Sequence, residues 1–229
     1  MKRLETFIQS VKAFALFAGL YLEKYLEQNL LDEKSRKPVL ITILAFLGLI
    51  AFIKIAEVVA EFAIERWRGL RRTILGDSYI EGVWFNKVPI ASPLYGLLRI
   101  EIKGESVRVS GEQYDKHGAN TAIWHSEMSK FDGSTLSYAY RATYSRHGEQ
   151  HEVHGVSQIS FGKVSRTGAP RSYNGHYHDS VGQQETCCFT GFRLEADIVD
   201  QLDKPTEKLP TVKQLIAQAD KLPQPVQAA

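Results

Sequence analysis

The stretch that decides the fold is LLRIEIK (Leu97–Lys103), followed by Gly104-Glu105 and then by SVRVSG (Ser106–Gly111). Apolar and polar residues alternate on both sides of the glycine-containing connection. Alternation of this kind is typical of strands with one buried face, and two such strands joined by a two-residue turn form a hairpin. The stretch therefore predicts antiparallel β-structure.

The same pattern recurs on either side of this hairpin. The other strands that it predicts are YIEGVWFN (Tyr79–Asn86), Thr121–Lys130, LSYAYRATY (Leu136–Tyr144), HEVHGVSQISF (His151–Phe161), YNGHYHD (Tyr173–Asp179) and CCFTGFRLE (Cys187–Glu195). Turns are expected at Asp132-Gly133 and around His147-Gly148. Because no helical segment interrupts them, the sequence predicts an all-β antiparallel barrel of about eight strands.

The first 75 residues have a helical, strongly apolar character instead. VLITILAFLGLIAFI (Val39–Ile53) contains no charged residue, and AFALFAGLYL (Ala13–Leu22) is a shorter apolar run. A membrane span needs about 20 apolar residues, so we expect a transmembrane helix over the first run, which continues beyond Lys54, and a span or an interfacial helix over the second. The basic residues that follow favour a multi-pass topology, with the barrel and both termini cytoplasmic. These residues are Arg66, Arg68, Arg71 and Arg72.

Three regions follow from this reading of the 229 residues. Residues 1–75 form a membrane-embedded helical hairpin with a basic juxtamembrane segment, 76–204 a ligand-sensing barrel, and 205–229 a tail with a short helix. The net charge of only +2 argues against a long nucleic acid as partner. The two cysteines, Cys187 and Cys188, are adjacent and so cannot staple the fold.

Alternation also assigns faces to the barrel residues. If Trp84 points inward, the predicted interior contains many tyrosines, several glycines and an arginine, unlike a core of Val, Leu and Ile. Either the tyrosines fill the barrel, or glycines leave room for a cavity in which aromatic rings stack on a planar ligand and an arginine meets its phosphate. The candidate ligand-binding residues are Trp84, Asn86, Tyr138, Tyr140, Arg141, Tyr173, Tyr177 and Arg193.

Two short motifs carry a resemblance to known proteins. Gly82-Val83-Trp84 on the first strand and Gly191-Phe192-Arg193 on the last resemble the GxW motif and the closing-strand arginine of lipocalin-type barrels. Two apolar helices before such a barrel, with GHYHDS (Gly175–Ser180) before its last strand, resemble the two-transmembrane β-strand-rich effectors of CBASS and related bacterial antiphage systems.

The resemblance implies a receptor for a cyclic di- or oligonucleotide that oligomerises on binding and disrupts the inner membrane, giving abortive antiphage defence. Its expected partners are the nucleotide, membrane lipids and further copies of itself. In some related systems the nucleotide restrains the effector, and loss of the nucleotide releases it. The sequence does not decide whether the nucleotide activates or restrains this protein.

Other functional classes remain as alternatives. An enzyme is disfavoured because no HExxH, paired CxxC, GxSxG or phosphate-loop motif occurs, so we expect neither catalysis nor a metal or cofactor. A membrane-tethered carrier of an apolar molecule and a structural interaction module with a filled barrel stay open.

Overall fold

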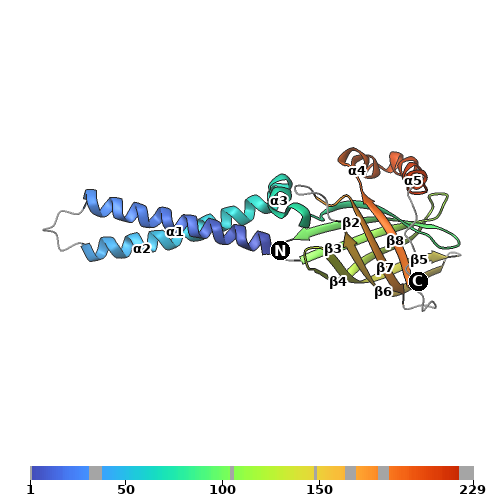
Figure 1. Cartoon of the computed structure of the whole chain (residues 1–229), viewed down its shortest axis with the longest axis horizontal. Helices are drawn as coiled ribbons and strands as arrows, with labels where there is room; N and C mark the ends of the chain where they lie inside the picture. The colour runs from blue at the N-terminus through green and yellow to red at the C-terminus, as the bar shows by residue number, and fades with distance from the viewer. Residues whose placement is uncertain are drawn as a thin grey trace. The chain divides into compact units, whose positions relative to one another are not determined.

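The computed structural model describes residues 2–30, 38–103, 106–146, 149–162, 169–179 and 186–221. The connections predicted at Gly104-Glu105 and His147-Gly148 lie outside these residues. The chain divides into two compact units, Met1–Leu75 and Gly76–Ala229 (Figure 1).

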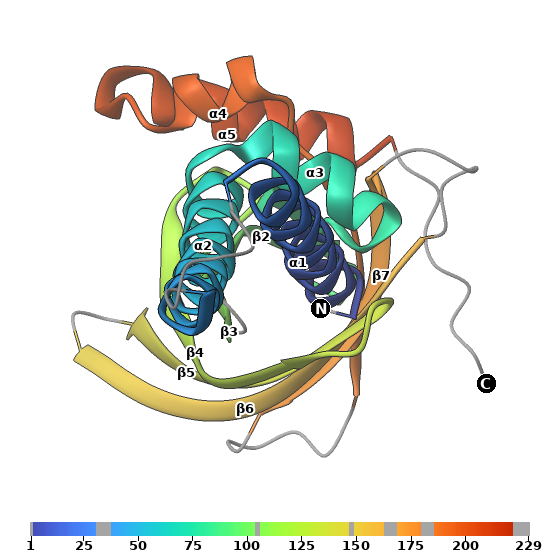
Figure 2. The same cartoon turned by 90° about the vertical axis from the view of Figure 1, so that its left-hand side faces the viewer.

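The N-terminal unit is a hairpin of two long helices followed by a short one. Helix α1 spans Lys2–Leu30, α2 spans Pro38–Arg66 and α3 spans Arg68–Leu75. The first two run side by side (Figures 1 and 2). Leu49 packs over Gly19, where a Cβ would overlap its side chain, and Lys12 of α1 forms an ion pair with Glu57 of α2. Gly19 and the Lys12–Glu57 ion pair therefore contribute to the contact between the helices.

Within the part of the chain that the structure describes, no helix has the length and apolarity needed to cross a bilayer. The predicted transmembrane hairpin is thus not supported by the described residues. Part of the apolar run on which that prediction rests, residues 39–46, lies outside the described side chains.

The second unit is the predicted barrel, closed by eight antiparallel strands in sequence order. Its strands are β1 (Gly82–Val88), β2 (Leu94–Lys103), β3 (Ser106–Tyr114), β4 (Asn120–Phe131), β5 (Thr135–Arg146), β6 (Glu149–Phe161), β7 (Ser172–Asp179) and β8 (Cys187–Arg193). Pairing of β1 with β8, in which Trp84 lies opposite Arg193, closes the barrel. The turn at Asp132-Gly133 forms as predicted: Gly133 has φ +100, and Asp132 accepts hydrogen bonds from the Ser134 and Thr135 amides.

The interior residues follow the alternation read from the sequence. Leu98 and Ile100 of β2 and Val109 of β3 are buried, whereas Arg108, the residue before Val109, is exposed. On β5, the candidate interior residues Tyr138 and Tyr140 are buried, and so are Leu136 and Ala142 at the same spacing of two. The alternation of apolar and polar residues therefore predicts correctly which residues of these strands face the barrel interior.

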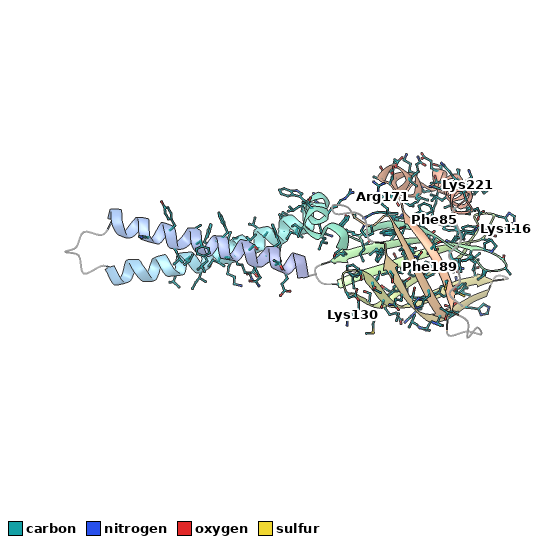
Figure 3. All side chains as sticks on the ribbon, viewed as in Figure 1. Phe85, Lys116, Lys130, Arg171, Phe189 and Lys221 are labelled. Atoms are coloured by element: carbon teal, nitrogen blue, oxygen red, sulfur yellow. The ribbon has the colours of Figure 1, made fainter. Side chains whose placement is uncertain are left out.

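Part of the outer surface is buried too, which the alternation does not predict. A short 3-10 turn at Gly76–Ser78 precedes β1. The C-terminal helices α4 (Ala196–Leu202) and α5 (Pro205–Ala219) cover the outer face of β1–β3 (Figures 1 and 2). A second apolar core lies between these two helices and the three strands. Its members include Val83, Phe85, Tyr95, Leu97, Tyr114, Leu202, Val212, Leu215 and Ile216. Figure 3 labels Phe85 on the strand below these helices.

Polar contacts attach the same helices to the barrel. Asp220, just after α5, pairs with Lys87 at 2.7 Å and accepts a hydrogen bond from the Tyr95 hydroxyl at 2.7 Å. Lys208 of α5 pairs with Glu112 of β3 at 2.8 Å. The region 196–219 therefore packs as part of the barrel unit.

Candidate functional site

A cavity of about 70 Å³ lies inside the barrel, partly open to solvent. It occupies the half of the barrel toward the end where β1 finishes and β8 begins, which we call the open end. The cavity is lined by Asn86, Val88, Tyr95, Gly96, Gln113, Trp124, Tyr138, Tyr140, Tyr144, Ser157, Tyr177 and Phe189. These residues come from β1–β8 in turn, so the closed sheet itself forms the wall.

The opposite end is filled. The Trp84 indole is fully buried and donates a hydrogen bond to the Ile80 carbonyl at 3.0 Å. The Arg193 guanidinium lies 5.3 Å from the Trp84 ring centroid and donates to the carbonyls of Tyr79 and Glu81. Leu136 and Ile159, both fully buried, complete this layer. Arg193 thus tethers the segment before β1, and the Trp84–Arg193 pair closes the base of the barrel.

The interior glycines are occupied, contrary to the expectation that they leave room. Each lies directly across a strand pair from a large side chain that packs over it. The pairs are Asn86 over Gly96, Trp124 over Gly111, Tyr140 over Gly155, Phe189 over Gly175 and Tyr173 over Gly191. A Cβ at any of these glycines would lie 2.3–2.5 Å from its partner's side chain. Because these glycines have no side chain, the partner side chains lie close against the sheet. The cavity is the space that remains inside the barrel.

Aromatic rings form one wall of the cavity. Trp124 of β4 and Tyr138 of β5 are stacked, with ring centroids 5.7 Å apart and planes inclined by 8°. Tyr140 is tilted against both, with centroids 5.9 Å from Trp124 and 6.1 Å from Tyr138. Figure 3 labels Phe189, which contributes from β8. Such a surface offers faces and edges on which a planar ligand can stack.

A carboxylate lies beside the cavity at the open end. The Tyr140 hydroxyl donates a hydrogen bond to Asp179, the last residue of β7. Burial raises the pKa of the Asp179 carboxyl above its usual range, although the Tyr140 hydrogen bond acts in the opposite direction. Burial, together with this carboxylate and Cys187, raises the pKa of Tyr144 to about 12. The phenols here are therefore neutral at physiological pH.

One polar atom of the lining has no partner. Asn86 is only 8% exposed, and its Nδ2 donates to the Tyr173 hydroxyl at 3.0 Å. Its Oδ1 accepts no hydrogen bond from any group that the structure describes. Buried polar atoms are almost always paired, so this carbonyl oxygen is a notable feature of the wall.

The eight residues predicted from the sequence fall into three groups. Asn86, Tyr138, Tyr140 and Tyr177 line the cavity, whereas Tyr173, Trp84 and Arg193 lie behind it or at its base. Arg141 is on the outer surface, where it pairs with Glu127 at 2.7 Å and with Glu152 at 3.0 Å. No arginine is therefore among the described residues that line the cavity.

Sequence reasoning missed Trp124 as a ligand-binding candidate. A register shift between Ser126 and Met128 interrupts the alternation of β4, so the face of Trp124 could not be assigned with the others. The available signal was Gly111 on the neighbouring strand, because an interior glycine opposite a large aromatic residue often receives its ring. Gln113 and Ser157 were also missed.

No protein-family model matches this chain, and no curated protein resembles it closely enough in sequence to be recognised as a relative.

Proposed function

We propose that this protein is a membrane-associated sensor whose barrel binds a cyclic di- or oligonucleotide by taking one base into the cavity. Ligand-dependent association of the N-terminal hairpins in a bilayer then disrupts the membrane. The observation that carries the proposal is the uncharged, aromatic-walled cavity inside a barrel closed at its base. The resemblance to CBASS effectors supports the same class of ligand.

The size of the cavity limits entry to part of one base. A cavity of about 150 Å³ encloses one benzene ring, so about 70 Å³, partly open to solvent, admits the edge of a base and no more. Clefts that enclose whole drug-sized ligands measure about 300–1,000 Å³. One base can therefore enter edge first against the aromatic residues, while the rest of a cyclic nucleotide stays at the open end.

The charge distribution favours the same arrangement. Among the described lining residues none is charged, and the carboxylate of Asp179 lies beside them. A phosphate deep in the barrel would lose its hydration without gaining a cation. Stacking on aromatic rings, by contrast, needs no charge and is worth about 1–3 kcal/mol per base.

The helical hairpin carries apolar side chains that need a partner. Phe14, Phe17 and Tyr21 of α1 are more than 70% exposed, and Val58 and Phe62 of α2 more than 60%. Large exposed apolar patches mark interaction with membranes or proteins. We propose that these side chains embed in the inner membrane and that hairpins of neighbouring molecules associate there, because anchored molecules are already concentrated and oriented.

A carrier of a neutral aromatic compound is the second candidate, because the cavity lacks charge. A carrier differs from the sensor in one respect: ligand binding to a carrier is not expected to change the permeability of a membrane. The expectation that the protein is not an enzyme stays a prediction.

Vesicle leakage tests the proposed function. The full chain is reconstituted into dye-loaded vesicles that contain anionic lipid, and cyclic di- and trinucleotides are added one at a time. An activated effector increases leakage with at least one of them, and a nucleotide-restrained effector leaks until the nucleotide is added. Leakage that no nucleotide changes in either direction would contradict the sensor and favour the carrier or a filled-barrel module.

A further inference from the structure

The unpartnered Asn86 oxygen has a defined position on the cavity wall. The Asn86 amide lies across Gly96, which carries no side chain, and a Cβ at that glycine would lie 2.3 Å from Oδ1. The amide is held from behind by Tyr173, which is only 2% exposed and packs against Trp84, Phe161 and Phe189. The oxygen is thus fixed by its surroundings while lacking a hydrogen-bond donor.

A second amide faces the same cavity from the other side of Gly96. The strand register places Asn86 opposite Gly96, and Gly96 opposite Gln113. The three residues therefore form one row across β1, β2 and β3, with a carboxamide at each end and the Asn86 amide packed over the glycine between them. Both carboxamides and the glycine line the cavity.

This row offers an acceptor and a donor to one edge of a planar molecule. Asn86 Oδ1 can accept one hydrogen bond, and a carboxamide such as Gln113 supplies both N–H donors and a carbonyl acceptor. Asparagine and glutamine pair in this way with adenine, whose amine is a donor next to a ring-nitrogen acceptor. Guanine and hypoxanthine instead present a carbonyl oxygen at the position of the adenine amine, which would face the Asn86 oxygen.

We propose that Asn86 and Gln113 pair with the 6-amine of a purine and the ring nitrogen beside it, so that among purines the preferred ligand is a cyclic nucleotide containing adenine, whereas a carbonyl oxygen at that position is disfavoured. This inference rests on the proposed function and specifies its ligand. Asn86 accepts a hydrogen bond from the amine, Gln113 donates to the ring nitrogen, and the ring lies against Trp124 and Tyr138. Binding supplies the partner that the buried oxygen lacks in the free protein.

Titration of the full chain in detergent micelles with three probes tests this inference. The probes are cyclic di-AMP, cyclic di-IMP and cyclic di-GMP, which share the sugar-phosphate ring and differ in the edge of the base. We expect cyclic di-AMP to bind at least about tenfold more tightly than the other two, because a site that pairs with a polar edge discriminates against an analogue leaving its groups unpaired.

Variants of Asn86 assign the effect to its oxygen. Asn86→Leu should abolish the preference for cyclic di-AMP, whereas Asn86→Asp, which keeps an acceptor and can accept from Tyr173, should retain it. If Asn86→Leu does not fold, Asn86→Asp and Gln113→Leu still test the assignment. Val88→Ala, in the same strand and cavity, is the matched control and should weaken all three probes equally.

The outcomes separate this inference from the proposed function. Equal binding of cyclic di-AMP and cyclic di-IMP, or tighter binding of cyclic di-GMP, would overturn the base selection and leave base insertion standing. A preference for cyclic di-AMP that survives in Asn86→Leu would also overturn it. Binding of none of the three by a folded chain would overturn the base selection whatever other nucleotide binds.

Discussion

The indole of Trp124 stacks on the ring of Tyr138 across the β4–β5 pair, with centroids 5.7 Å apart and planes 8° from parallel. Neither ring is free to turn, because Trp124 packs over Gly111 and Tyr138 packs against both Trp124 and Tyr140. The pair therefore presents a preorganised aromatic wall to the cavity, which lowers the entropic cost of binding a planar ligand.

Replacement of Trp124 by leucine should weaken nucleotide binding by about one to two decades, because stacking is worth about 1–3 kcal/mol per base. Calorimetric titration of the full chain with cyclic di-AMP measures the change. Trp67→Leu is the matched control, since Trp67 is 63% exposed and lies in the N-terminal unit. An unchanged affinity in the Trp124 variant would place the ligand elsewhere.

Gly191→Ala should destabilise the barrel by about 1–3 kcal/mol, because the added methyl group overpacks the interior. Its Cβ would lie 2.4 Å from the ring of Tyr173, which is buried and held by Asn86. Thermal unfolding followed by circular dichroism measures the loss. Gly48→Ala provides the comparison, since nothing lies within 4 Å of its Cβ position, and it should leave stability unchanged or slightly higher. Equal stability of the Gly191 variant would mean that Tyr173 can move aside.

These glycines show where sequence reasoning succeeds and where it stops. The alternation of polar and apolar residues predicts the strands, their antiparallel order and the inward face of Tyr138, because a pleated strand repeats every two residues. It cannot tell an interior glycine that leaves space from one that accepts a neighbour's ring, because that depends on the register between strands. Gly191 and Tyr173 are 18 positions apart in the chain yet directly opposite in the sheet.

Burial of the outer face of β1 likewise depends on residues that are distant in the sequence. Alternation predicts solvent at Val83 and Phe85, but both are buried beneath α4 and α5. Near-continuous apolar character, as in Val83–Phe85, is typical of a strand covered on both faces, and the covering element lies more than a hundred residues later in the chain. For Arg141, by contrast, the alternation itself gives the observed face. Its position between Tyr140 and Ala142 indicates the outer surface, where it pairs with Glu127 and Glu152.

The Asp179 carboxyl should make stability depend on pH in an unusual direction. Because burial raises its pKa in the folded state, its contribution to stability is fully present below the pKa of the unfolded chain and is lost as pH rises through the folded pKa. Asp179→Asn should therefore raise the melting temperature at pH 7 by a few degrees, and the difference from the wild type should shrink as the pH falls toward 4.

Asp132→Asn provides the control of opposite sign. The amides of Thr135 and Ser134 donate to Asp132 and lower the pKa of its carboxyl, so its stabilising contribution is present at neutral pH and lost on acidification. This variant should melt below the wild type at pH 7. A lower melting temperature for Asp179→Asn as well would mean that the Asp179 carboxylate gains more from its partners than it loses by burial.

Binding of the hairpin to lipid should depend on its exposed aromatic side chains. Phe17→Ser combined with Phe62→Ser should reduce co-flotation of the full chain with vesicles severalfold while leaving nucleotide affinity unchanged, because both residues are in the N-terminal unit. Ile123→Ser combined with Met128→Ser removes exposed apolar side chains from β4 instead and should change flotation little. Equal losses in the two double variants would argue against a specific role of the hairpin.

Thermal unfolding of the full chain against a panel of cyclic di- and trinucleotides tests most directly whether the barrel is a nucleotide receptor. A ligand that binds only the folded state stabilises it by RT ln(1 + [L]/Kd), which is about 2.7 kcal/mol at 100 times Kd. The account predicts such a shift with at least one nucleotide, largest for one containing adenine and strongly reduced in Trp124→Leu. No shift with any member of the panel, for a chain that unfolds cooperatively, would contradict it.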